Sequence, residues 1–328
     1  MQRTDITSDK KRKKEIIKGL NIAAFLAPAL LLFVGVLIAP IFMSTYYSFF
    51  DWNGMGAKTF VGLENYRELF TSEDFKFGLA LRNSLLLAVL SVFIQLPLSL
   101  ALALALGKGI KGERTFLSVF FAPVLISTVV IGQLWLKIYN PDYGLLNAAL
   151  RAITLEKTID AEGNVIVLKT LEDVLVKWSG DVKDVLWLGN QKIALGSAFV
   201  PILWQYVGYH MLLMYAGVKG VPIDLREAAM LDGASNGQVN RYIVLPHIKP
   251  IIKISVIFAV TGSLKSFDLI YVLTNGGPFH STEVPSTLMI SLMFLRNRYG
   301  MGSTIAVILI ILCFAFALLI GAFFRKED

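Results

Sequence analysis

The chain has 328 residues, of which 55% are hydrophobic and 17% charged, and its formal net charge is +7. A soluble domain of ordinary composition carries about 25% charged residues, so this composition excludes a typical soluble globular protein. The apolar residues gather in blocks of about 20, the length that crosses roughly 30 Å of hydrocarbon as a helix. The blocks are continuously apolar rather than alternating, which favours helices over barrel strands. The sequence predicts an all-α membrane protein with six transmembrane helices, over residues 22–47, 84–105, 115–138, 193–217, 251–272 and 302–324.

The first block follows a basic stretch, as the apolar region of a signal peptide would. A signal peptide has an apolar region of about 7–15 residues, whereas this block continues to Met43. We therefore expect an uncleaved helix. In the connection that follows, residues 51–82, the side chains of Leu63, Tyr66 and Phe70 stand at helical spacing. This spacing predicts a short helix lying along the membrane surface.

Lysine and arginine mark one side of the predicted bundle. If the six helices alternate in direction, the basic residues in the short flanks all fall on the same side, which the positive-inside rule assigns to the cytoplasm. These residues include Lys108 and Lys111 after the second helix, Arg226 and Arg241 after the fourth, Arg325 at the end, and the N-terminal residues 10–14. Both termini are therefore predicted to be cytoplasmic. The basic collar also favours anionic membrane lipid, which explains the charge without nucleic-acid binding.

The connection between the third and fourth helices, residues 139–192, is unusually long. Within it, we interpret residues 151–185 as an extracytoplasmic insertion. The insertion is expected to contain a turn at 160–164, a strand at 165–168 and a helix at 170–178, with Thr170 as the N-cap and Asp173 assisting it. Three interpretations remain open: a passive cap over the outer mouth, a contact surface for a substrate-delivering protein, or an irregular loop.

Residues 224–250, between the fourth and fifth blocks, are too polar to cross a bilayer. Asp224 is expected to cap a helix that begins near Leu225, with Glu227 in the first turn, near the positive end of the helix dipole. Gly233 would end this helix in the left-handed conformation, which glycine adopts without a Cβ penalty. The helix would present a face formed by Leu225, Ala228, Ala229 and Asp232, and a second helix would cover residues 237–244 and end at Pro246.

This segment resembles a known family. Glu227-Ala228-Ala229, three residues, Gly233, nine residues and then Ile243-Val244-Leu245-Pro246 match the cytoplasmic EAA loop of type I ABC importer permeases at every fixed position. Residues 274–278, Thr-Asn-Gly-Gly-Pro, resemble a stretch of carbohydrate-importer permeases, and the resemblance covers residues 65–324. It implies the type I ABC importer permease fold. It also implies that the loop docks in a cleft on an ATPase subunit, with Glu227, Ala228, Ala229, Asp232 and Gly233 as the coupling element.

The resemblance further implies the partners and the surroundings. One copy of the chain would supply half of the pathway for a carbohydrate, expected to be an oligosaccharide, in a bacterial or archaeal inner membrane. It would pair with a second, non-identical permease subunit, two ATPase subunits and an extracytoplasmic solute-binding protein. Residues 1–83 would hold the N-terminus, the first helix and the first outer loop, and residues 84–324 would form the permease core.

The sequence offers no means of covalent chemistry. It has no G-x-x-x-x-G-K-[ST] motif for nucleotide phosphates, its single cysteine is Cys313, and its three histidines lack the spacing of a zinc site. We therefore expect no bound cofactor and no enzymatic activity, with ATP and Mg used by the partner subunits; a membrane-embedded enzyme is disfavoured for the same reason. An ion-coupled secondary transporter, the main alternative, would need midplane carboxylates or inverted repeats. Neither is evident, because Asp268 falls toward the outer end of its block.

Polar residues at membrane depth are candidates for the substrate path, because they must face a partner or a watery cavity. In the fourth block Gln205, Tyr206 and Tyr209 form one stripe, and in the fifth Ser263 and Ser266 lie on a face of small residues. Sugars stack on aromatic rings and their hydroxyl groups need hydrogen bonds, so we expect these faces to line the path. By the resemblance, they fall where maltose-type permeases line their sugar site. The competing interpretation is that the small residues only allow close helix packing.

Two basic groups, Lys265 and His210, stand beside these stripes. Lys265 could neutralise an acidic sugar, extend to the outer interface or pair with a partner chain. The sequence leaves the roles of both residues open.

Overall fold

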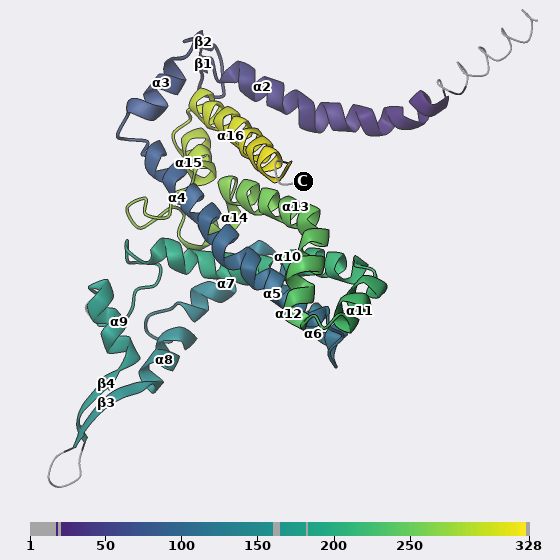
Figure 1. Cartoon of the computed structure of the whole chain (residues 1–328). Coiled ribbons are helices and arrows are strands. Elements are labelled where there is room, and N and C mark those ends of the chain that lie inside the picture. Colours follow the sequence, from purple (N-terminus) through teal and green to yellow (C-terminus); the bar gives the residue numbers. More distant parts are fainter. Residues whose placement is uncertain (1–17, 19–20, 160–164, 182, 326–328) are drawn as a thin grey trace, which may run out of the picture.

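Helices dominate the chain, and Figure 1 shows them as a bundle with an arm at one end. The computed structural model describes residues 18, 21–159, 165–181 and 183–325. Among these residues, four helices are long and apolar enough to cross a membrane: Asn21–Tyr47, Phe77–Leu106, Asn236–Leu273 and Tyr299–Arg325. A fifth span results if the bent pair Glu113–Leu125 and Thr128–Ile138 is counted as one.

The remaining predicted span, the fourth in chain order (193–217), corresponds to α10 (Ala194–Gly220). Its 27 residues are long enough to cross a bilayer, but it is not among the helices apolar enough to do so by composition. Polar side chains, among them Gln205 and His210, lower its hydropathy. The total of six transmembrane helices therefore stays a prediction. The cytoplasmic placement of both termini also stays a prediction, because the basic residues 10–14 lie outside the described residues.

The third predicted helix is broken, so the prediction of one helix over residues 115–138 is wrong. α6 (Glu113–Leu125) and α7 (Thr128–Ile138) meet at an angle of 98°. Ile126 and Ser127, between them, take extended backbone conformations with ψ angles of 139° and 132°. Pro123 lies in the last turn of α6 and has no N–H to donate, which weakens the helix where the chain turns.

The prediction that a helix ends at Pro246 is also wrong. α12 (Asn236–Val239), the π-turn η3 (Asn240–Val244) and α13 (Leu245–Leu264) follow one another without a break. In the wider π-turn the N–H of Leu245 donates to the carbonyl oxygen of Asn240. This local widening accommodates the proline that follows, because it removes the need for a regular donor there.

The same helix ends earlier than predicted at its other end. α13 stops at Leu264, and the chain resumes helical structure as α14 (Asp268–Leu273). Residues 265–267 between them are not helical. The span Asn236–Leu273, which contains the predicted helix over 251–272, is therefore interrupted near its end, and the break carries the polar residues Lys265 and Ser266.

The centre of the bundle is formed around α10 and α13. α10 contacts α5 (Leu96–Leu106), α6 and α13, while α13 also contacts α4 (Phe77–Leu90) and α16 (Tyr299–Arg325). α4 continues through η2 (Ser91–Gln95) into α5. Gly208 of α10 lies so close to α6 that a Cβ atom there would fall 1.8 Å from the carbonyl oxygen of Phe120. Only a glycine permits this helix crossing.

The first helix stands largely apart from this bundle. It contains η1 (Phe33–Ile38) and α2 (Ala39–Tyr47), and α2 contacts α16. None of its most apolar 18-residue window is buried within the chain, and Figure 1 shows its N-terminal half running clear of the other helices. Its apolar side chains are therefore available to lipid or to another subunit.

Short elements tie the segment after the first helix to the start of α16. β1 (Phe50–Asp51) and β2 (Thr59–Phe60) form a small hairpin, and α3 (Glu64–Thr71) confirms the predicted short helix. Arg298 donates to both carboxylate oxygens of Glu68, at 2.7 and 2.6 Å. The hydrogen bond from Arg298 lowers the pKa of Glu68 below its usual value. Before α16, α15 (Pro285–Ile290) and η4 (Ser291–Leu295) complete this region.

The arm corresponds to the predicted insertion. It consists of α8 (Leu145–Ala152), the antiparallel strands β3 (Thr154–Ile159) and β4 (Val165–Thr170), and α9 (Leu171–Ser179). The predicted strand and helix are confirmed, as is the capping box formed by Thr170 and Asp173. β3 was not predicted from the sequence, and the predicted turn at 160–164 lies outside the described residues. Regular structure excludes the irregular-loop interpretation.

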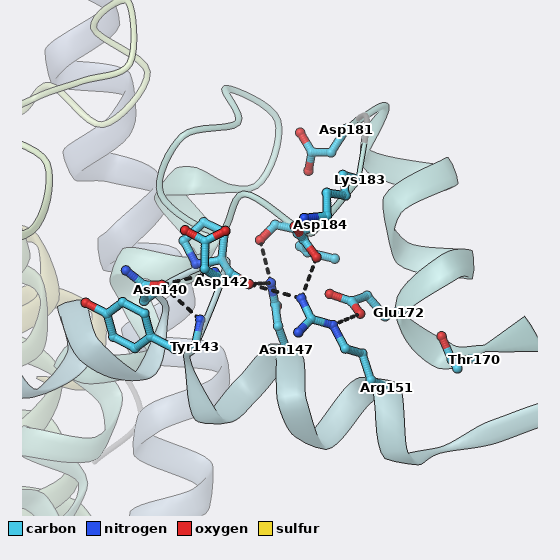
Figure 2. A network of polar contacts seen from close by, with 12 residues as sticks. Asn140, Asp142, Tyr143, Asn147, Arg151, Thr170, Glu172, Asp181, Lys183 and Asp184 are labelled. Carbon is cyan, nitrogen blue, oxygen red and sulfur yellow. Dashed lines mark hydrogen bonds and ion pairs between the residues drawn. The ribbon is translucent and has the colours of Figure 1, made fainter.

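Figure 2 shows the polar contacts that hold the arm together. Arg151 of α8 donates to Glu172 of α9 at 2.6 Å and also to Asp184 in the segment after α9. Asn147 accepts a hydrogen bond from Trp187 at 2.6 Å and donates to the carbonyl oxygen of Val185. These contacts join the insertion to the connection on either side of it.

Asp181 stabilises the segment that leads from α9 of the arm back to the bundle. Burial raises its pKa, but the N–H of Leu186 and the side chains of Ser179 and Asn190 donate to it at 2.7–3.0 Å. The donors prevail, so the pKa of Asp181 lies below its usual value. This carboxylate stays charged and holds three parts of the connection in place.

Candidate functional site

A pocket of about 490 Å³ opens between α10 and α13. It is lined by four of the five predicted path residues, namely Tyr206, Tyr209, Ser263 and Ser266. The two faces predicted from separate helices thus meet in one space. Their role in transport stays a prediction.

The pocket lies where the helices depart from regular geometry. Val124 and Thr128, on either side of the 98° bend between α6 and α7, line one side of it. Lys265 and Ser266, at the break between α13 and α14, line another. Gly262 leaves open space, since a Cβ atom there would meet no atom within 4 Å. The two breaks that the sequence did not predict therefore border this cavity.

On the serine side of the pocket, the hydroxyl groups already form hydrogen bonds within the protein. Ser263 donates to the carbonyl oxygen of Ala259 at 2.8 Å, and its Oγ lies 3.2 Å from Oγ of Ser91 in η2. Ser91 and Gln95 also line the pocket. Neither residue was predicted to line the path, although a polar side chain in the middle of the second apolar block is the same signal that identified the other two faces.

The aromatic side of the pocket comes from α10. Tyr209 is half-buried, with its ring centroid 6.5 Å from that of Phe258 and 5.2 Å from that of His210, which it meets edge-on. Tyr206, one turn earlier, is 39% exposed. Aromatic faces next to hydroxyl and amide groups suit a ligand that is both ring-shaped and rich in hydroxyls.

Gln205, predicted in the same stripe, does not line this pocket with Tyr206 and Tyr209. It is buried, does not line the pocket, and donates from Nε2 to Oγ1 of Thr128 at 3.3 Å. Neighbouring residues on a helix point about 100° apart, so Gln205 faces α7 while Tyr206 faces the cavity. Its contact is with a residue that lines the pocket rather than with the pocket itself.

The predicted coupling element forms a helix at the end of the bundle opposite the arm (Figure 1). α11 (Ile223–Leu231) begins two residues earlier than predicted, with Pro222 at the N-cap, so Asp224 lies in the first turn and does not cap it. Proline fixes a φ angle that suits this position. Glu227 and Ala228 are exposed, whereas Ala229 packs against the cluster that contains Val218 and Ile248. Ala229 therefore faces the bundle, whereas the prediction placed it on one face with Leu225, Ala228 and Asp232.

The end of α11 follows the prediction. Gly233 has a φ of +85°, and the N–H groups of Gly233 and Ala234 donate to the carbonyl oxygens of Met230 and Ala229 at 3.0 and 2.9 Å. This pair of bonds is the Schellman arrangement. Ser235 and Gln238 then form a capping box that starts α12. The result is a helix, a tight turn and a second helix.

Large apolar side chains of α11 are exposed beside Glu227 and Ala228. Leu231 is 89% exposed and Ile223 66% exposed, and Leu225 and Met230 are exposed as well. A set of exposed large apolar side chains on a polar segment is the usual mark of a protein contact.

Comparison with known proteins places this geometry in a family. Residues 95–327 match the family described as binding-protein-dependent transport system inner membrane component. A probable ABC transporter permease protein, YurN of Bacillus subtilis, is 36% identical over 311 residues, covering 93% of this chain and 96% of that protein. The diacetylchitobiose uptake system permease protein NgcF of Streptomyces coelicolor is 28% identical, covering 95% of this chain and 84% of that protein.

Solved structures share the fold. The crystal structure of a bacterial ABC transporter that imports the acidic polysaccharide alginate has a chain that aligns with a TM-score of 0.76 and 20% identity, covering 96% of this chain and 99% of that one. A second structure of the bacterial alginate transporter, in complex with an alginate pentasaccharide-bound periplasmic protein, aligns equally well. The family match covers most of the chain and includes α11 and nearly all of the pocket. The chain is a multi-pass membrane protein that belongs to the binding-protein-dependent transport system inner membrane component family and is the transmembrane subunit of an ABC importer.

Proposed function

We propose that this importer carries a carbohydrate, and more narrowly an oligosaccharide. The observation that carries the proposal is the pocket of about 490 Å³, which Tyr206, Tyr209, Ser263 and Ser266 line together. Rings that stack and groups that hydrogen-bond are what a sugar requires. The names of the relatives, one a diacetylchitobiose permease and others alginate importers, support the same substrate class.

The proposed subunit works in a larger assembly. It pairs with a second, non-identical permease and two ATPase subunits in a bacterial or archaeal inner membrane, and a solute-binding protein delivers the sugar from outside. ATP and Mg are used by the ATPases, and this chain binds no cofactor. Residues 1–83 form the N-terminal part and residues 84–324 the permease core.

In the proposed cycle α11 docks on an ATPase subunit, with Glu227, Ala228, Ala229, Asp232 and Gly233 as the coupling element. The exposed apolar side chains of α11 support this contact. ATP-driven closure of the ATPases moves α11, and α10 and α13 follow, because both are continuous or nearly continuous with the coupling segment. The pocket then opens alternately to the two sides as a two-state change.

The membrane arrangement in this proposal is six helices with both termini in the cytoplasm. A single-cysteine test checks it after Cys313 has been replaced by serine, since the chain has one cysteine. Lys111→Cys should be protected from a membrane-impermeant thiol reagent in intact cells, and Lys177→Cys in α9 should be labelled. The reverse pattern overturns the orientation and the coupling assignment with it.

The function is tested by uptake. Cells with and without this chain are given a panel of radiolabelled neutral and acidic oligosaccharides, while an affinity tag on the chain is used to copurify its partners. Uptake of at least one oligosaccharide that depends on the chain, together with a copurified ATPase, is expected. An ion-coupled secondary transporter would instead show uptake driven by an ion gradient, with no ATPase attached.

A further inference from the structure

Asp268 places a carboxylate on the wall of the pocket. It is the first residue of α14, directly after the break that follows α13, and it is an exposed residue that lines the cavity. Within the part of the chain that the structure describes, its side chain forms no ion pair and no hydrogen bond. The wall therefore offers a charged acceptor that a ligand in the pocket can reach.

The charge of Asp268 lies near the aromatic side of the pocket. α14 contacts α10, and the carboxylate interacts electrostatically with the phenol of Tyr206, which lines the same cavity. Lys265 is the other ionised residue on this wall, and its charge acts on Cys313 of α16, which does not line the pocket. The carboxylate is therefore the charge that a ligand beside the tyrosine ring meets.

A carboxylate beside an aromatic ring suits a neutral sugar. An ionised carboxylate only accepts hydrogen bonds, and its two oxygens can accept from two hydroxyl groups at once. Hydrogen bonds to a charged acceptor are about twice as strong as those between neutral groups. An acidic sugar brings a second carboxylate instead, which has no proton to donate near neutral pH and is repelled by the like charge of Asp268.

We propose that Asp268 is a specificity-determining residue, which accepts hydrogen bonds from hydroxyl groups of the substrate in the pocket and thereby selects neutral over acidic oligosaccharides. The inference rests on the proposed carbohydrate function. The competing role is structural, because an acidic residue in the first turn of a helix interacts favourably with the helix dipole. A structural role predicts less assembled complex and an unchanged uptake rate per complex.

The test uses the complete importer, copurified through a tag on this chain and reconstituted in vesicles with its binding protein. Asp268→Asn keeps the shape and one acceptor oxygen but removes the charge, whereas Asp268→Leu removes the acceptors as well. Asp74→Asn is the matched control, because Asp74 is an exposed residue that does not line the pocket. The probe is a radiolabelled neutral oligosaccharide that the unaltered importer takes up, and rates are normalised to assembled complex.

We expect Asp268→Asn to lower the maximal uptake rate about five- to fiftyfold, and Asp268→Leu to lower it further. Asp74→Asn should transport like the parent. A parent-like rate per complex in Asp268→Asn overturns the inference and leaves Asp268 with the structural role. If the unaltered importer takes up acidic oligosaccharides and no neutral ones, the inference fails while the proposed function stands. If it takes up no oligosaccharide of either kind, the proposed function itself fails.

Selection against acidic sugars is measured without the binding protein, which has a specificity of its own. Equilibrium dialysis of the purified importer gives dissociation constants for the transported sugar and for the same sugar with one primary alcohol oxidised to a carboxylate. The unaltered importer should bind the neutral form more tightly, and Asp268→Asn should narrow the ratio of the two constants about tenfold. An unchanged ratio, tighter binding of the oxidised form by the unaltered importer, or no binding of either form at millimolar concentrations overturns the inference.

Discussion

Arg226, in α11, donates a hydrogen bond to the backbone carbonyl oxygen of Val218, in the last turn of α10. The carbonyl oxygen of Val218 also accepts from the N–H of Val221 at 3.4 Å, so Arg226 adds a second donor, from the neighbouring helix, at the end of α10. α10 also carries the aromatic side of the pocket. This single contact thus joins the segment proposed to meet the ATPase to the helix that lines the pocket.

Arg226→Ala should weaken the connection between α11 and α10. The loss of a hydrogen bond from a charged group costs about 1–3 kcal/mol. We expect the subunit to insert and copurify with the ATPase, while substrate-stimulated ATP hydrolysis falls several-fold. Arg241→Ala, in the same segment with an exposed side chain, serves as the control and should hydrolyse ATP like the parent. Equal hydrolysis in all three proteins would show that the contact carries no coupling.

Gly233→Val tests the turn after α11. A Cβ atom at Gly233 would meet no atom within 4 Å, so the only cost is backbone strain at a φ of +85°. That strain is roughly 1 kcal/mol or more for a β-branched residue, and Gly233→Asn should cost less, because asparagine tolerates this conformation. ATPase copurification should therefore fall in the order glycine, asparagine, valine. Full transport by Gly233→Val would contradict a role for the turn in shaping the docking element.

Tyr209→Ala removes the aromatic face from the pocket. Loss of the ring and the hydroxyl should weaken the transient sugar site by about 1–3 kcal/mol, or about 5- to 150-fold. Membrane insertion and ATPase copurification should be preserved, since the coupling helix is untouched. Tyr209→Phe keeps the ring and separates the two contributions. Parent-like uptake by a normally assembled Tyr209→Ala would make this a packing position.

Gly208→Ala tests the crossing of α10 and α6. The added methyl group would lie 1.8 Å from the carbonyl oxygen of Phe120, a backbone atom that cannot move without shifting a helix. We expect a loss of stability of roughly 1–3 kcal/mol or more and little assembled complex on size-exclusion chromatography. Gly196→Ala, on the same helix in open space, should assemble at least as well as the parent, because alanine favours helix.

The ion pair of Glu68 and Arg298 predicts a pH dependence of stability. The pair lowers the pKa of Glu68 in the folded protein, so its stabilisation is present above the unfolded pKa and is lost as pH falls through the folded value. The thermal unfolding temperature of the parent should exceed that of Glu68→Gln near neutral pH, and the gap should close in acid. Glu64→Gln, on the same helix with an exposed carboxylate, should show a much smaller gap.

Local chemistry made several features predictable. Thr170 with Asp173 specifies a helix start, and Gly233 specifies a helix end, because each depends on atoms within a few residues. That Tyr209 and Ser263 line one pocket could be predicted for a similar reason, because polar groups at membrane depth must face a cavity or a partner.

The breaks in the helices were not predictable in the same way. The bend at Ile126 and the end of α13 at Leu264 occur within apolar stretches, where the hydropathy pattern gives no information about the direction of the backbone. The orientation of Gln205 toward Thr128, and of Ala229 toward Val218, depends on which neighbour packs there. Tertiary contacts determine the orientation of such side chains, and the pattern of a single sequence does not reveal those contacts.

The isolation of the first helix has a thermodynamic consequence. In water a helix with so much apolar surface uncovered would aggregate, but lipid chains solvate leucine and phenylalanine as well as a protein interior does. The helix Asn21–Tyr47 therefore gains nothing from hydrophobic burial when another helix arrives. Any partner must be recognised by shape and close packing alone. Insertion of this subunit and its joining to others are accordingly separable events, and the free subunit can persist in the bilayer until its neighbours have been made.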